Sequence, residues 1–164
     1  MRVKDVIILG AGASKSEGAP LQNELFKEFF EYYRQVLKGK TWSLSKKQEN
    51  LIIEYFRNFW GIDIENYQNH TVEFPTFEEC LGVLDLAYFR GESFKRCTRK
   101  KIDQIRNALI FLIAKILDEK LRGKIIHHKN LVMRLKYTSK LNKTAFISLN
   151  YDIIIDNVFN KVVS

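Results

Sequence analysis

A short apolar run at residues 6–9 ends in a glycine-rich turn at residues 10–14 and limits the folds open to this chain. An apolar residue at every position, rather than at alternate positions, is typical of a parallel strand covered by helices on both faces. Pro20 follows the turn, and proline is favoured in the first turn of a helix. The apolar positions that then recur at helical spacing are Leu21, Leu25, Phe29 and Val36. Residues 6–37 therefore predict a strand, a glycine turn and a helix.

A second strand is predicted at residues 144–149, which are β-branched and apolar. It ends at the polar turn of residues 150–152, and apolar residues at helical spacing follow over residues 153–162. If both strands belong to one parallel sheet, their carboxyl ends lie at the same edge, where ligands bind in open α/β sheets. We therefore expect residues 10–14 and residues 150–152 to meet around one pocket.

The long stretch between the two strands is predicted to be helical. Capping boxes at residues 45–48 and 76–79 begin two helices, and residues 61–75 between them are predicted to form a loop. A long amphipathic helix ends near Gly123, and a weaker helix covers residues 130–141. The predicted fold is a single α/β domain over residues 1–164, with a Rossmann-like parallel sheet, a helical insertion at about 40–141, and a sheet expected to be incomplete at the C-terminus.

The glycine turn has the chemistry of a phosphate-binding loop. A strand, a glycine turn and a helix present backbone N–H groups to a phosphate, and the helix dipole adds partial positive charge. Glycine allows close approach of the backbone or a positive φ. The turn lacks the third glycine of the dinucleotide fingerprint, where Lys15 stands, and no Gly-Lys-Ser/Thr makes it a P-loop. A plain turn between strand and helix is the alternative interpretation.

Several segments resemble the sirtuin family. Gly10-Ala-Gly-Ala-Ser14 followed by Gly18-Ala-Pro20 looks like the G-A-G-x-S…G-x-P signature of sirtuins. Phe146-Ile-Ser-Leu-Asn-Tyr-Asp152 resembles the S-x-N-Y-D strand end of bacterial sirtuin-like proteins, and residues 76–84 resemble the acidic, leucine-bearing helix start between those motifs. The resemblance covers residues 6–159.

This resemblance implies NAD or ADP-ribose as the ligand. In relatives used in antiphage defence, the domain acts as an NADase that cleaves the nicotinamide–ribose bond. The resemblance assigns the catalytic position beside that ribose to Asn150. The residues that it assigns to cofactor binding are Gly10, Ala11, Gly12, Ala13, Ser14, Gly18, Pro20, Asn150 and Asp152. Loss of nicotinamide creates an oxocarbenium-like ribose, which a fixed polar group and a general base would assist.

The sequence also departs from the family. It has no four-cysteine zinc module, since Cys80 and Cys97 are its two cysteines, and no metal site is predicted. The family's catalytic histidine follows the asparagine motif, whereas no histidine follows His128 here. His127 and His128 are expected to be polar residues at a helix start. The isolated chain is therefore expected to cleave NAD poorly or only to bind it.

The formal net charge of +8 leaves a second function class open. A basic nucleic-acid or protein interaction module that keeps the fold without catalysis is the alternative to an NAD-binding domain. The basic cluster at residues 95–101 fits either phosphate contacts or a solvated loop. No apolar run approaches the roughly 20 residues that span a bilayer, so we expect a soluble protein. Two cysteines do not make a secreted disulfide scaffold, so we expect a reduced, cytoplasmic compartment. The partners expected are further copies of the chain or a separately encoded C-terminal half.

Overall fold

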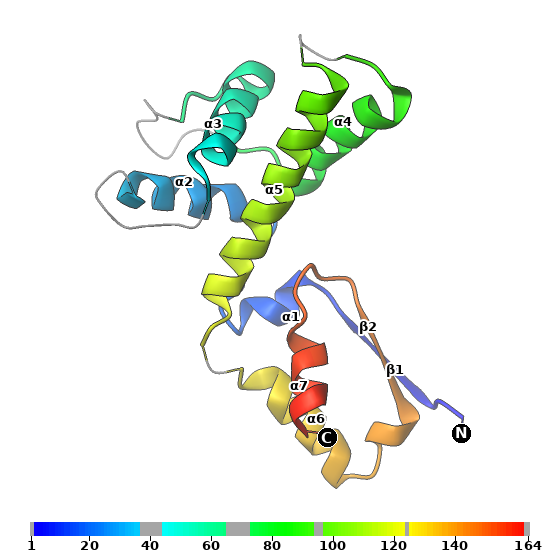
Figure 1. Cartoon of the computed structure of the whole chain (residues 1–164). Helices are drawn as coiled ribbons and strands as arrows, with labels where there is room; N and C mark the ends of the chain where they lie inside the picture. Colours follow the sequence, from blue (N-terminus) through cyan, green and yellow to red (C-terminus); the bar gives the residue numbers. More distant parts are fainter. Residues whose placement is uncertain (1, 37–43, 65–72, 94–96, 124, 163–164) are drawn as a thin grey trace. The chain divides into compact units, whose positions relative to one another are not determined.

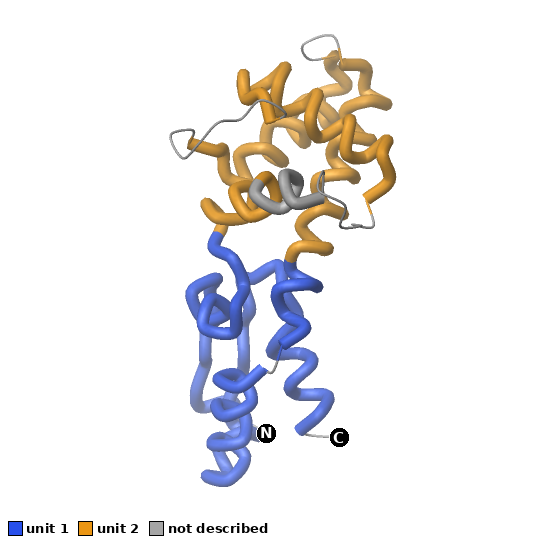
Figure 2. The backbone as a smooth tube through the Cα atoms, turned by 90° about the vertical axis from the view of Figure 1, so that its left-hand side faces the viewer, with its two compact units in different colours: residues 1–21, 117–164 blue, residues 22–116 orange. Residues whose placement is uncertain are grey.

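The computed structural model describes residues 2–36, 44–64, 73–93, 97–123 and 125–162 (Figure 1). The described chain is mixed α/β and mostly helical, with one two-stranded sheet. It divides into two compact units, shown in Figure 2. Unit 1 consists of residues 1–21 and 117–164, and unit 2 consists of residues 22–116. The segment that forms unit 2 overlaps the predicted helical insertion but begins and ends earlier.

The sheet of unit 1 joins the two strands that the sequence predicts. β1 (Asp5–Leu9) and β2 (Thr144–Ser148) run parallel, with Asp5 opposite Thr144 and Leu9 opposite Ser148. Both strand predictions are confirmed. The pairing brings the two strand ends, and hence the two turns that follow them, to the same edge of the sheet.

The helix after the glycine turn differs from the prediction. A short helix, α1 (Ala11–Lys15), begins directly after Gly10, and the next helix, α2 (Leu25–Val36), begins only at residue 25. The prediction that Pro20 lies in the first turn of a helix is wrong. A Schellman-type turn separates the two helices: the Ala19 N–H donates to the Ser14 carbonyl, and Gly18 has φ 102°. Glycine is favoured there because other residues rarely adopt that conformation.

The remaining helices of unit 1 cover one face of the sheet. α6 (His127–Tyr137) and α7 (Ile154–Val162) both lie on the same side of β1 and β2 (Figure 1). Their buried core consists of Leu9, Val132, Ile154, Ile155 and Val158, with Ile7 and Phe146 packed against it. The other face carries exposed Val6 and Ile8, so the expectation that helices cover both faces is not met within the described residues.

Unit 2 is built from helices with an aromatic core. Its elements are α2, α3 (Lys46–Tyr55), the π-helix η1 (Phe56–Trp60), α4 (Phe77–Arg90) and all but the last turn of α5 (Arg99–Lys120). Both predicted capping boxes are confirmed: Gln48 N–H donates to Ser45 Oγ at 3.3 Å, and Glu79 N–H donates to Thr76 Oγ1 at 3.2 Å. The core side chains include Phe26, Phe29, Phe30, Tyr55, Phe56 and Phe77.

Other sequence predictions have slightly different bounds in the structure. α5 ends at Lys120 rather than near Gly123, and the helix predicted at residues 130–141 is α6, which begins at His127. The described parts of the predicted loop, residues 61–64 and 73–75, contain no helix or strand, and its remainder lies outside the described residues. Residues 99–101 of the basic cluster form the first turn of α5, and residues 95–96 lie outside the described residues.

Within the described ranges, no helix combines the length and apolar composition needed to cross a membrane.

Candidate functional site

The glycine turn and Asn150 meet at the carboxyl edge of the sheet, as the sequence predicts. The Leu149 N–H donates to the Leu9 carbonyl at 2.9 Å, which continues the strand pairing to the edge. One residue further on, Asn150 Nδ2 donates to Ser14 Oγ at 2.8 Å. This hydrogen bond joins residues that are 136 positions apart and fixes both segments around one point.

The Asn150 side chain leaves one polar atom unsatisfied. Its Oδ1 is buried and has no hydrogen-bond partner among the described residues, while Ser14 is 1% exposed. An unpaired buried acceptor costs about 1–3 kcal/mol, and such atoms are uncommon in folded proteins. The Asn150 amide oxygen is therefore an acceptor without a partner at this edge of the sheet.

The glycines of the turn are not required by the fold itself. Gly10 precedes α1 with φ −105°, and neither Gly10 nor Gly12 has a positive φ. A Cβ at either position would meet no atom within 4 Å. The positive φ that the sequence suggests for the turn occurs instead at Gly18. The two glycines thus leave the backbone N–H groups at the start of α1 open to a partner, since Gly10 has no side chain to cap them.

The helix dipole contributes less than the sequence suggests. The helix that directly follows the glycine turn, α1, has only five residues. The macrodipole is a sum over aligned peptide units, so a helix of this length carries a weaker one than the long helix expected from the sequence. The turn therefore offers local N–H donors rather than a strong helix terminus.

The other predicted ligand residues have structural roles. Gly18 and Pro20 belong to the turn that ends α1, and Pro20 is buried. Asp152 Oδ1 accepts a hydrogen bond from the Ile154 N–H at 3.1 Å and so caps α7. Ala13 packs against the core of unit 1. Among the described residues, no hydrogen bond joins Gly18, Pro20 or Asp152 to the side chain of Ser14 or Asn150.

A buried hydrogen-bonded pair, Glu17 and His128, was missed by sequence reasoning. One Glu17 oxygen, Oε1, accepts from the His128 N–H at 2.8 Å and lies 3.0 Å from His128 Nδ1, while Oε2 accepts from the Ile126 N–H at 2.9 Å. Both side chains are almost completely buried, at 2% and 4% exposed. Glu17 therefore caps the start of α6 and ties it to the segment after the glycine turn. His128 lies at a helix start, as predicted, but it is paired rather than solvated.

The Glu17 carboxyl is held in its charged form. Burial raises its pKa, but the hydrogen bonds from the backbone of His128 and Ile126, together with the His128 ring, bring the pKa below the ordinary value of 4.5. A lowered pKa in the folded state means that the ionised group stabilises the fold above the unfolded pKa, and that this contribution is lost as pH falls through the folded value.

The first prediction concerns this pH dependence. Between pH 6 and pH 3 the free energy of unfolding of the wild type should fall more steeply than that of Glu17→Gln, which has no charge to lose. Urea unfolding at a series of pH values measures both curves. Glu119→Gln, a change at an exposed position, should follow the wild type. Parallel curves for the wild type and Glu17→Gln would contradict the assignment.

Two further observations limit the reactions that the described residues can carry out. Cys80 and Cys97 are both buried, and burial raises the pKa of the Cys80 thiol to about 12, so it stays protonated at neutral pH. No group of three or more His, Cys, Asp or Glu in the described ranges is placed to hold a metal ion.

A separate cavity lies in unit 1 away from the glycine turn. It measures about 650 Å³ and is formed by the residues before α6 together with α6 and α7. Lys129 and Lys161 contribute its charged groups. None of the residues predicted from the sequence to bind the ligand lines it.

Comparison with known proteins does not assign a family. No family model matches the chain, and no solved structure matches it. The chain is similar to an F-box protein of Arabidopsis thaliana, with 31% identity over 85 residues. The matched segment covers 48% of this chain and 21% of that protein.

Proposed function

We propose that the chain is a sirtuin-like NAD-binding domain with a Rossmann-like sheet, in which residues 10–14 contact the phosphates and Asn150 contacts the ribose that carries nicotinamide. The observation that supports this proposal most is the hydrogen bond between Asn150 and Ser14 at the carboxyl edge of two parallel strands. That edge is where open α/β sheets bind ligands. A ribose hydroxyl that donates to the unpaired Asn150 Oδ1 would satisfy it.

The same geometry favours binding over rapid turnover by this chain alone. Asn150 can orient a ribose and stabilise positive charge through its amide oxygen, but it is not a general base. Two ionisable residues of unit 1 have other partners: His128 pairs with Glu17, and Asp152 caps α7. We therefore propose a domain of an NAD-hydrolysing, defence-type protein that is weakly active or inactive when isolated.

The second prediction follows from this assignment. Purified chain incubated with NAD should release nicotinamide little faster than buffer, because a positioned acid or base typically contributes about 10²–10⁴-fold to such rates. Chromatographic measurement of nicotinamide tests this. Rapid release that disappears in Asn150→Ala would show that the site is a complete catalyst.

The alternative function is a basic nucleic-acid or protein interaction module. Its support is the charge of unit 1, in which twelve lysines and arginines stand against six aspartates and glutamates. Such a surface attracts polyanions independently of any nucleotide site.

The third prediction separates the two functions by thermal shift. NAD at about 100 times its dissociation constant stabilises a folded protein by about 2.7 kcal/mol, which should give a clear rise in Tm. Short duplex DNA at matched phosphate concentration and physiological salt should give none. A rise with DNA and none with NAD would favour the alternative.

A further inference from the structure

The cavity of unit 1 is formed largely by one face of α6 and one face of α7. Its volume of about 650 Å³ lies within the range of about 300–1,000 Å³ that is typical of small-molecule sites. The two helix faces contribute Ile126, Lys129 and Asn130 from the start of α6, and Asn157, Val158 and Lys161 from α7. Within each set the residues are spaced by three or four positions, which places them on the same side of a helix.

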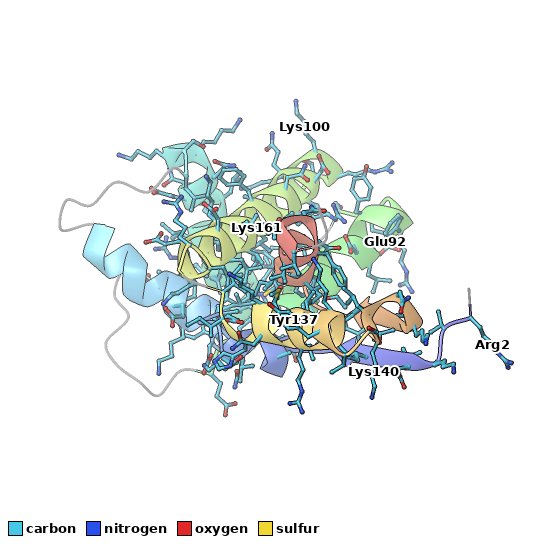
Figure 3. The ribbon with its side chains drawn as sticks, turned by 90° about the horizontal axis from the view of Figure 1, so that it is seen from below. Arg2, Glu92, Lys100, Tyr137, Lys140 and Lys161 are labelled. Carbon is cyan, nitrogen blue, oxygen red and sulfur yellow. The ribbon has the colours of Figure 1, made fainter. Side chains whose placement is uncertain are left out.

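The ammonium groups of the two lysines that line the cavity are uncommitted. Among the described residues, neither Lys129 nor Lys161 forms an ion pair or a side-chain hydrogen bond. Lys161 lies in the last turn of α7 and is labelled in Figure 3. By contrast, Lys136 on α6 donates from Nζ to the Val162 carbonyl at 2.6 Å. Both cavity lysines are therefore free to contact a ligand.

The other polar groups of the cavity also favour an anion. The side-chain amides of Asn130 and Asn157 form no hydrogen bond with the described residues, so each can donate from its NH₂ group. No described aspartate or glutamate lines the cavity. The carboxylate of Glu17 is bound to the N–H groups of Ile126 and His128 and is almost completely buried. The charged groups that line the cavity are therefore all positive.

The rest of the lining is apolar. Val158 is 4% exposed and belongs to the core of unit 1, whereas Ile126 is 51% exposed at the edge of the cavity. Ile125 contributes a third aliphatic side chain. A ligand that placed an apolar group against these side chains would remove them from water, which is favourable.

We propose that this cavity binds a small organic phosphate monoester. At neutral pH such a group carries a charge of about −1.5 to −2, which two ammonium groups match better than they match the single charge of a carboxylate. Asn130 and Asn157 donate to the remaining phosphate oxygens, while Ile126 and Val158 contact the organic part. NAD has no terminal phosphate group, and none of residues 10–14 lines the cavity, so this site is separate from the proposed nucleotide site.

An amide-resolved NMR titration of the full chain with phenyl phosphate tests the proposal. Saturable shifts are expected at the cavity residues Lys129, Asn130, Asn157 and Lys161. Inorganic phosphate lacks the apolar group and benzoate carries one charge, so both should bind at least about tenfold more weakly. Gly12→Val should bind phenyl phosphate as the wild type does, because the glycine turn does not line the cavity.

A double variant, Lys129→Gln with Lys161→Gln, should weaken the binding of phenyl phosphate at least about tenfold, because it removes two charged donors. The matched control is Lys140→Gln with Lys143→Gln, which removes the same charge from exposed positions of unit 1 outside the cavity and should retain the affinity of the wild type. Circular dichroism should confirm that all variants are folded.

Three results would overturn the proposal. They are the absence of saturable shifts at about 10 mM phenyl phosphate, shifts confined to residues 10–14, and an equal loss of affinity in the two double variants. Benzoate that binds as tightly as phenyl phosphate would also overturn it, because the cavity would then not distinguish a phosphate monoester from a carboxylate.

Discussion

Valine in place of Gly12 is expected to abolish NAD binding while leaving the stability of the chain unchanged. A Cβ added at Gly12 would meet no protein atom within 4 Å, and Gly12 does not have a positive φ. The helix propensity of valine is no worse than that of glycine. The fold therefore has room for a Cβ at this position, and the substitution is expected to act mainly on a ligand that approaches the backbone of the turn. Calorimetric titration should show binding to the wild type and none to Gly12→Val.

A matched control separates this effect from a general one. Gly82 in α4 also has open space around its Cβ position and belongs to unit 2. Gly82→Val should bind NAD as the wild type does. Equal affinity of Gly12→Val and the wild type would remove the glycine turn from the binding site.

Alanine in place of Glu17 is expected to lower the free energy of unfolding more than alanine in place of any other described polar residue. It would leave the N–H groups of Ile126 and His128 and the His128 ring without their acceptor in a site that is almost completely buried. Each unsatisfied buried group costs about 1–3 kcal/mol, so a total loss of about 3 kcal/mol or more is expected. Small proteins are stable by only about 5–15 kcal/mol, and the variant should melt at a much lower temperature.

Thermal and urea unfolding followed by circular dichroism measure this loss. Glu119→Ala, at an exposed position of α5, should change stability by no more than about 0.5 kcal/mol. A loss for Glu17→Ala that is no greater than the loss for Glu119→Ala would mean that the Glu17–His128 pair does not hold α6 in place.

Local patterns predicted those parts of the fold that depend on neighbouring residues. Residues 6–9 and 144–149 are dense in strand-forming side chains, and both form strands. The capping boxes at Ser45 and Thr76 depend on atoms three positions apart, so the sequence is enough to identify them. The meeting of Asn150 with the glycine turn follows from a rule about parallel sheets once two strands are known.

Other features depend on contacts that no local pattern contains. Glu17 caps a helix more than 100 positions away, and a glutamate between Ser16 and Gly18 carries no signal of that role. The start of α2 was misplaced because Gly18 ends α1 in a left-handed turn that moves Pro20 out of the helix. The apolar run of β1 suggested burial on both faces, yet helices cover only the side of Leu9 in the described chain. Apolar composition shows that burial of a face is favourable, but it does not identify the residues that cover the face.

An amide-resolved NMR titration of the isotope-labelled chain with ADP-ribose would locate the nucleotide site residue by residue. We expect saturable shifts that are largest at residues 10–14 and at Asn150, and no such shifts in Gly12→Val. Shifts confined to the Lys129–Lys161 cavity would contradict the assignment of this edge as a nucleotide site. The absence of saturable shifts at about 1 mM ADP-ribose, which would detect a dissociation constant of about 1 mM, would contradict it equally.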